Sequence, residues 1–162
     1  MYSGVAVSSD DPGGIAVSAA QQIPIAEGLF TWPSNDPRLL GSKCGNCGVV
    51  TFPAQKSCPA CSGQNVETIE LERRGTLWTW TIQGFMPNRP PYTGPETPEN
   101  FKPFGVGYVE LPGQVRVESR LKCKDPSTLR IGMEMELVVE KYVVDDAGRE
   151  VMAYFFQPVA ER

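Results

Sequence analysis

The sequence predicts a mainly β protein with an N-terminal arm, a four-cysteine ribbon and a small C-terminal barrel. Two CxxC pairs predict the ribbon, and short runs rich in Val, Ile, Tyr, Phe and Trp predict the strands. The length of 162 residues suits one modest core beside a metal-stapled module. The predicted segments are a flexible tail at 1–27, the arm at 28–43, the ribbon at 44–66 and the barrel domain at 67–162.

The two cysteine pairs, Cys44 with Cys47 and Cys58 with Cys61, have the spacing of a closed four-thiolate metal site. Each pair can occupy a tight turn whose backbone N–H groups point at the sulfurs, and Gly48 supplies backbone freedom to the first turn. Four thiolates select zinc or, less often, iron, and they leave no position open to water or substrate. We therefore expect a structural Zn²⁺ held by these four cysteines.

Two disulfides and a rubredoxin-like iron site are the alternatives for these cysteines. Disulfides require an oxidising compartment, and the N-terminus lacks a charged segment followed by an apolar run. No stretch approaches the ~20 apolar residues of a membrane span, so we expect a cytoplasmic protein with reduced thiols and no membrane association. Iron would use the same sulfur ligands and would serve electron transfer.

Composition narrows the function classes. The net charge is −4 and the pI is near 4.9, which makes nucleic acid an unlikely partner because binding to phosphates depends on many Lys and Arg contacts. The chain has no histidine, so it cannot form a Ser-His or Cys-His pair or a histidine metal triad. We therefore expect no catalytic residue in this chain, although Asp, Glu, Lys, Tyr or Cys chemistry stays formally open.

The segment at 28–43 differs from the Ser-, Gly- and Ala-rich tail before it, because it carries Phe30, Trp32 and Leu39. Such large apolar groups must pack on something. Either they cover the ribbon or the barrel, or they form a docking surface for a partner.

Six runs read as strands, at 66–71, 76–82, 104–111, 115–121, 135–144 and 151–156. Alternation assigns Trp78, Trp80 and Ile82 to one buried face, with Thr79 and Thr81 on the wet face. If that assignment is reversed, the two tryptophans become exposed platforms. A hairpin turn is expected at 145–148, and six short strands of this kind suggest a closed barrel of the OB type.

The proline-rich loop at 85–103 is long for a connection within a small barrel, and long ordered loops are often functional. Contact with a ligand or a partner, or an ordinary solvated surface, are the two interpretations of the side chains in and near this loop. The candidates are Arg73, Arg74, Arg89, Tyr92, Phe101 and Lys102.

Two further features have an ordinary and a functional interpretation. Cys123 lies between two lysines and is either an activated thiol or a strand-end residue, and no histidine is present to activate it. Gly105 and Gly107 resemble part of a nucleotide-binding glycine pattern, but no helix is expected after them. Bulging or close packing explains these glycines better.

The chain resembles a family in which a rubredoxin-like zinc ribbon precedes an OB-fold and which is associated with acyl-CoA metabolism. The resemblance covers about residues 28–158. The motifs that carry it are the first cysteine pair, Phe52-Pro53, the second pair beginning Cys58-Pro59, and the stretches at 75–81, 103–111 and 131–133.

The resemblance implies an accessory subunit of a thiolase-like enzyme, with the nucleophilic cysteine and the histidines in the partner. Family settings include thiolysis of benzylsuccinyl-type thioesters, aldol cleavage of steroid side chains and acetylation of phloroglucinols. It further implies a heterotetramer, with two copies of each chain, and a CoA thioester shared between the subunits. CoA carries several negative charges and needs Arg or Lys, so the resemblance makes the candidates named above possible contacts with CoA or the partner. A nucleic-acid-binding module and a self-sufficient enzyme are the alternatives.

Overall fold

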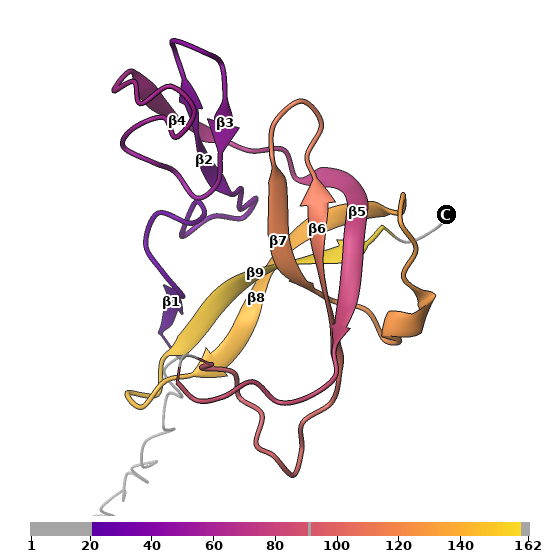
Figure 1. Cartoon of the computed structure of the whole chain (residues 1–162). Helices are drawn as coiled ribbons and strands as arrows, with labels where there is room; N and C mark the ends of the chain where they lie inside the picture. Colours follow the sequence, from indigo (N-terminus) through magenta and orange to yellow (C-terminus); the bar gives the residue numbers. More distant parts are fainter. Residues whose placement is uncertain (1–20, 91, 160–162) are drawn as a thin grey trace, which may run out of the picture.

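Five strands close into a barrel in the C-terminal part of the chain (Figure 1). The computed structural model describes residues 21–90 and 92–159. Antiparallel pairing joins β5 to β6 and β8, β6 to β7, and β8 to β9, and a parallel contact between β7 and β9 completes the ring. The barrel strands are β5 (Arg74–Gln83), β6 (Phe104–Glu110), β7 (Arg116–Leu121), β8 (Glu134–Val144) and β9 (Glu150–Pro158).

These five strands confirm five of the six runs predicted from the sequence, with ends that differ by no more than two residues. The predicted hairpin at 145–148 joins β8 to β9. Asp145 shapes this turn, because its carboxylate accepts hydrogen bonds from the backbone N–H groups of Ala147 and Arg149. Gly148 supplies the positive φ of 77° that the turn requires. A one-turn 3-10 helix, η1 (Pro126–Thr128), lies between β7 and β8.

The inward side chains of the barrel strands form the core. Met135 and Leu137 of β8, for example, are fully buried. The same cluster continues into the arm and the linker, so the arm packs on the barrel core. The buried members are Phe30, Leu39, Leu71, Leu77, Val109, Leu111, Val117, Leu121, Leu129, Met135, Leu137, Met152 and Phe156.

A β-bulge in β5 overturns part of the predicted face assignment. Leu77 pairs with Val109, but the next paired residue is Thr79 with Tyr108, so Trp78 is the extra residue. Its side chain is 45% exposed, while Leu77 is fully buried and Trp80 packs against the core. The prediction of a buried face is wrong for Trp78, because an inserted residue shifts the alternation at that point. It is also wrong for Ile82, which is 43% exposed near the end of β5.

The sixth predicted run lies in the ribbon and not in the barrel. The ribbon sheet consists of β2 (Leu40–Cys44), β3 (Val50–Thr51) and β4 (Val66–Glu70), in the order β3-β2-β4. We expected 66–71 to begin the barrel, but β4 pairs antiparallel with β2 along its whole length. The ribbon therefore extends beyond the predicted 44–66 on both sides. A run of β-forming residues shows that a strand exists, while its partner depends on the tertiary structure.

A short strand, β1 (Gln22–Pro24), pairs in parallel with β9. The amide of Ile25 continues this contact with a hydrogen bond of 2.8 Å to the carbonyl of Met152. This strand lies within the segment predicted as a tail at 1–27, so the described part of that segment is ordered against the barrel. Residues 1–20 of the predicted tail lie outside the described residues.

The apolar side chains of the arm pack within the chain, which was the first of the two alternatives. Phe30 is 3% exposed and Leu39 is fully buried, and the two residues form an isolated β-bridge. Trp32 is partly buried and meets the ring of Phe30 edge to face, with centroids 6.2 Å apart. The burial of Phe30 and Leu39 supports the first alternative, and the docking of a partner by the arm stays a prediction.

Candidate metal centre and the surfaces beside it

The four predicted cysteine ligands converge at one point of the ribbon. All four sulfurs lie within 4.8 Å of one another. The Sγ atoms of Cys44 and Cys61 are 3.7 Å apart, and those of Cys47 and Cys58 are 3.5 Å apart. A tetrahedral zinc site with Zn–S bonds of about 2.3 Å has sulfur–sulfur distances of about 3.8 Å. The arrangement therefore fits a zinc ion.

Two matching turns position these sulfurs. In the first turn, the amide of Gly48 donates to the carbonyl of Cys44 at 2.9 Å. In the second, the amide of Ser62 donates to the carbonyl of Cys58 at 2.9 Å. Both turns end in a left-handed residue, with φ of 75° at Gly48 and 57° at Ser62. The second turn thus places a serine where the backbone favours glycine.

Backbone N–H groups favour the thiolate form of the first cysteine in each pair, Cys44 and Cys58. The amides of Cys47 and Asn46 lower the pKa of the Cys44 thiol to about 6. The amide of Cys61 is the main cause of the lowered pKa of the Cys58 thiol, against the opposing effect of burial. For Cys47 and Cys61 the amides of Val49 and Gly63 lower the pKa, but hydrogen bonds with neighbouring cysteines outweigh them, so the pKa of these two thiols is raised. Thiolates are the metal-binding form of cysteine, so the backbone prepares one cysteine of each pair for a metal.

Four cysteine donors suit a metal ion with a structural role. Cys44, Cys47, Cys58 and Cys61 would supply all four ligands of a zinc ion, and such a site leaves no position for substrate. When bound, the ion would hold the two turns together and contribute folding free energy to the ribbon. These residues confirm the four-cysteine cluster predicted from the sequence.

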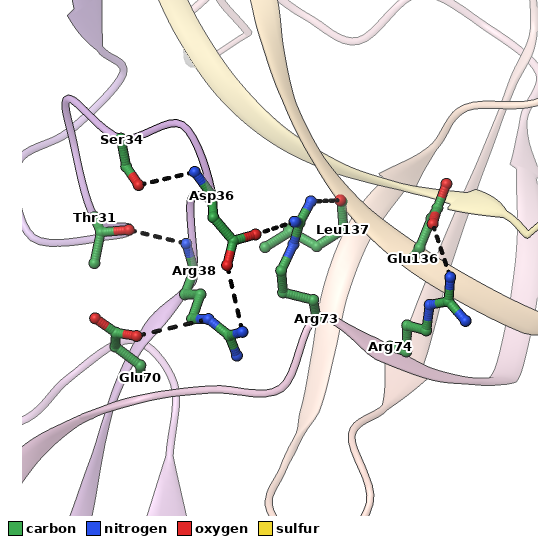
Figure 2. Close-up of polar contacts among 9 residues, drawn as sticks. All are labelled: Thr31, Ser34, Asp36, Arg38, Glu70, Arg73, Arg74, Glu136 and Leu137. Carbon is green, nitrogen blue, oxygen red and sulfur yellow. Dashed lines mark hydrogen bonds and ion pairs between the residues drawn. The ribbon is translucent and has the colours of Figure 1, made fainter.

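Arg73 and Arg74, two of the predicted CoA contacts, are engaged within the chain (Figure 2). Arg73 lies in the linker between ribbon and barrel, where it pairs with Asp36 of the arm. It also donates to the carbonyl of Leu137 in β8 at 3.0 Å. Arg74, the first residue of β5, lies 3.5 Å from a carboxylate oxygen of Glu134. Arg73 thus joins the arm, the linker and the barrel.

The loop at 85–103 is held by contacts between its own residues and β7. Arg89 donates to the carbonyl of Glu96 at 2.6 Å and pairs with the carbonyl of Gly94. The Tyr92 hydroxyl donates to the Glu96 carboxylate at 2.6 Å, and Arg120 of β7 pairs with the same carboxylate at 2.9 Å. Arg89 and Tyr92 are therefore parts of the loop's internal scaffold.

The Glu96 and Tyr92 pair has shifted pKa values. Burial opposes ionisation of Glu96, but the hydrogen bonds from Tyr92 and Arg120 outweigh burial and lower the pKa of its carboxyl group. Burial, followed by the hydrogen bond to Glu96, raises the pKa of Tyr92. At neutral pH Glu96 is therefore ionised and Tyr92 is protonated, which is the state that their hydrogen bond needs.

The other two loop candidates, Phe101 and Lys102, lie near the barrel. The Phe101 ring meets the ring of Phe104 with centroids 5.9 Å apart. Lys102 lines a pocket of about 590 Å³ at the junction of the loop with β7, β8 and β9. Lys102 is the one cation of the four predicted from the sequence that reaches this pocket.

Four cations of this pocket were missed by sequence reasoning. Arg120 lies in β7, Lys122 and Lys124 follow it, and Lys141 lies in β8. Sequence reasoning considered Lys122 and Lys124 only as the neighbours of Cys123. Cys123 also lines the pocket, and burial raises the pKa of its thiol, which disfavours the activated form. The spacing of the two lysines by two residues was the available signal, because it places them on one side of an extended chain.

Gly105 and Gly107 are explained by close packing. A Cβ on Gly107 would lie 2.5 Å from the carbonyl oxygen of Thr79, and one on Gly105 would lie 2.9 Å from a methyl group of Leu129.

No helix in the described ranges is long and apolar enough to cross a membrane.

Two family models match this sequence. One is described as the rubredoxin-like zinc ribbon domain of ChsH2 and covers residues 34–67, and the other is described as the C-terminal OB-fold domain of ChsH2 and covers 68–140. Among curated relatives, a DUF35 domain-containing scaffold protein of Pyrococcus furiosus is 33% identical, over 75% of this chain and 84% of its own length.

A second relative and a solved structure extend this comparison. The benzoylsuccinyl-CoA thiolase subunit BbsA of Thauera aromatica is 32% identical, over 76% of this chain and 78% of its own length. The solved structure described as an Ltp2-ChsH2(DUF35) aldolase has a TM-score of 0.55 and 24% identity, and the match covers 75% of this chain and 84% of that one. The structural likeness supports the fold.

Proposed function

Since this chain belongs to the ChsH2-type DUF35 family of zinc-ribbon and OB-fold proteins, we propose that it is the non-catalytic zinc subunit of a heteromeric thiolase-like complex. The observation that carries the proposal is the match to both domains of that family, in order and without a break between residues 34 and 140. In this role the chain supports the binding and turnover of an acyl-CoA by a catalytic partner.

The chemistry of the chain supports an accessory role. The sequence contains no histidine, the commonest general acid and base of enzymes, which supports a role in which a partner supplies the acid–base chemistry of thiolysis. The ribbon's four thiolates form a closed site that suits structure and not catalysis. A cytoplasmic location belongs to the same proposal, because these cysteines bind metal in their reduced form.

The substrate class rests on one named relative. BbsA, which is 32% identical to this chain, is by name a subunit of benzoylsuccinyl-CoA thiolase. We extend this to a partner that cleaves an aromatic β-oxoacyl-CoA by thiolysis, with two copies of each chain in a heterotetramer. Two substrate tests follow from this extension. The purified chain alone should not turn over CoA esters, and the chain mixed with its partner should.

Co-purification tests the proposal directly. The tagged chain is recovered from its native host, bound proteins are identified by mass spectrometry, and zinc is measured in the same sample. A stoichiometric thiolase-fold protein and one zinc per chain are expected. Recovery of the chain alone, or with nucleic acid, would contradict the proposal.

The nucleic-acid alternative has one feature in its favour, the exposed ring of Trp78. That ring is already in contact with the guanidinium of Arg116, which lies 3.9 Å from the ring centroid and pairs with Glu110. Tyr108 meets the edge of Trp78, and its hydroxyl donates to Glu118. Carboxylates beside a stacking platform repel phosphates, so we do not propose this function.

A further inference from the structure

The pocket between the loop and the barrel carries a positive charge in a chain that is negative overall. Its cationic lining consists of Lys102, Arg120, Lys122, Lys124 and Lys141, while Glu96 is the one carboxylate in the lining. The whole chain has a net charge of −4. The pocket lining has five cationic side chains and one anionic one, so the sign of its charge is opposite to that of the whole chain.

Not all of this charge is neutralised by nearby carboxylates. Arg120 pairs with Glu96, Lys122 with Glu140, and Lys141 with Glu150. Lys102 and Lys124 make no ion pair within residues 21–90 and 92–159, and both side chains are exposed. Two ammonium groups at the rim of the pocket thus remain available for an anionic ligand.

Aromatic rings form part of the pocket wall. Tyr142 and Phe155 lie with centroids 6.1 Å apart, and Phe104 carries the guanidinium of Arg120 at 3.8 Å from its centroid. Arg120 is held both by this ring and by Glu96, so it is fixed at the wall. A wall of rings with a rim of cations suits a ligand that has a flat heterocycle and phosphates.

The geometry points to a binding site for the phosphorylated nucleotide end of a CoA ester, at the pocket formed by Lys102, Arg120, Lys122, Lys124 and Lys141. This inference rests on the proposed function, in which an acyl-CoA is the substrate of the complex. The nucleotide end carries a diphosphate and a separate ribose phosphate, and the pocket offers cations on three segments of the chain. Its volume of about 590 Å³ lies in the usual range of small-molecule sites, about 300–1,000 Å³.

An acidic protein segment is the competing ligand, and the observations favour the nucleotide. Stable protein interfaces bury about 800 Å² on each partner and spread over a broad surface. Here the cations surround one concavity, and the rings line the same space. A small polyanion with a heterocycle uses both features at once.

Titration of the zinc-loaded full chain, labelled with ¹⁵N, tests the inference. Coenzyme A and adenosine 3′,5′-bisphosphate should produce saturable shifts at the amides of Lys102, Cys123, Lys124 and Lys141. Pantetheine lacks the nucleotide and should leave these amides unchanged. Added salt should weaken binding, since the contacts are ionic. The inference is overturned if millimolar CoA produces no saturable shift at these amides, or if pantetheine produces the same shifts.

A charge-reversal variant gives the matched control. Lys102→Glu with Lys124→Glu should weaken CoA binding about tenfold or more, because two exposed ionic contacts become repulsive. Lys56→Glu changes an exposed lysine in the ribbon and should leave CoA binding unchanged. Equal affinity in both variants would overturn the inference. So would binding of a glutamate-rich peptide at this pocket without binding of CoA.

The co-purification experiment separates the two proposals. If a thiolase-fold partner is recovered and CoA does not bind the pocket, the nucleotide site fails while the accessory role stands. If CoA binds the pocket and no such partner is recovered, the accessory role fails while the nucleotide site stands.

Discussion

Gly48 and Ser62 hold equivalent places in the two metal-binding turns, each directly after the second cysteine of a pair and each with a positive φ. Glycine adopts that conformation freely, whereas serine pays a steric penalty there.

Replacing Ser62 with glycine should therefore stabilise the ribbon. We expect a gain of up to about 1 kcal/mol in the free energy of unfolding, because strain at φ 57° is relieved. Gly48→Ala should destabilise the ribbon by a similar amount. Thermal unfolding of both zinc-loaded variants measures the two effects, and a lower melting temperature for Ser62→Gly would contradict the expectation.

Loss of zinc should unfold the ribbon and leave the barrel folded. Cys44→Ser or Cys58→Ser removes one thiolate from the four-sulfur cluster, and a closed zinc site contributes folding free energy directly. Zinc per chain should fall toward zero, and NMR signals of residues in β2 and β4 should collapse while those of β5 to β9 persist. One zinc per chain in both variants would show that the ligand assignment is wrong.

Arg73 should stabilise the junction of ribbon and barrel. Its guanidinium pairs with Asp36 and donates to the carbonyl of Leu137, and about a third of the side chain is exposed. Arg73→Met should cost about 1–2 kcal/mol in unfolding free energy, because hydrogen bonds to charged groups are worth more than neutral ones and exposure reduces the effect. A double-mutant cycle with Asp36→Asn isolates the pair, and a coupling energy of zero would contradict the link.

The loop at 85–103 should loosen in acid through Glu96. Its pKa is lowered in the folded chain, so the stability that it contributes is present above the ordinary glutamate pKa of about 4.3 and is lost as the pH falls through the folded value. NMR chemical shifts of Tyr92 and Arg120, the two residues that contact Glu96, report the opening of the loop. Glu96→Gln should abolish this acid transition, and a transition of unchanged midpoint would assign it to another group.

The bulge in β5 predicts unequal roles for its two tryptophans. Trp78 is 45% exposed, so Trp78→Ser should change the unfolding free energy by no more than about 0.5 kcal/mol beyond its contact with Arg116. Trp80 packs against the core, and Trp80→Ala should cost about 3 kcal/mol. Urea unfolding of the two variants provides the comparison, and equal losses would contradict the register described here.

The sequence was sufficient for the features that depend on local patterns. The cysteine spacing predicted the metal cluster, the period-two alternation predicted the barrel strands, and the motifs predicted the family that both domains match. The bulge at Trp78 escaped, because one inserted residue reverses the alternation without any change in composition.

The pairing partners of strands and the clusters of surface side chains could not be predicted from the sequence for a different reason. The run at 66–71 was recognised as a strand, yet its partner β2 lies 22 to 30 positions earlier in the sequence, from the pair of Cys44 and Val66 to the pair of Leu40 and Glu70. The basic pocket combines residues from the loop, the end of β7 and β8, which lie far apart in the sequence. No local pattern brings such side chains together.

The parallel pairing of β1 with β9 constrains the order in which a nascent chain can fold. The two strands are separated by 128 positions, from Gln22 to Glu150, so the pairing has to wait until the C-terminal strand has been synthesised. The ribbon sheet is complete once β4 has left the ribosome, and it can take up zinc while the barrel strands are still being made. The topology therefore allows metal loading before barrel closure, and the first described residues of the chain pair only after the last barrel strand has been made.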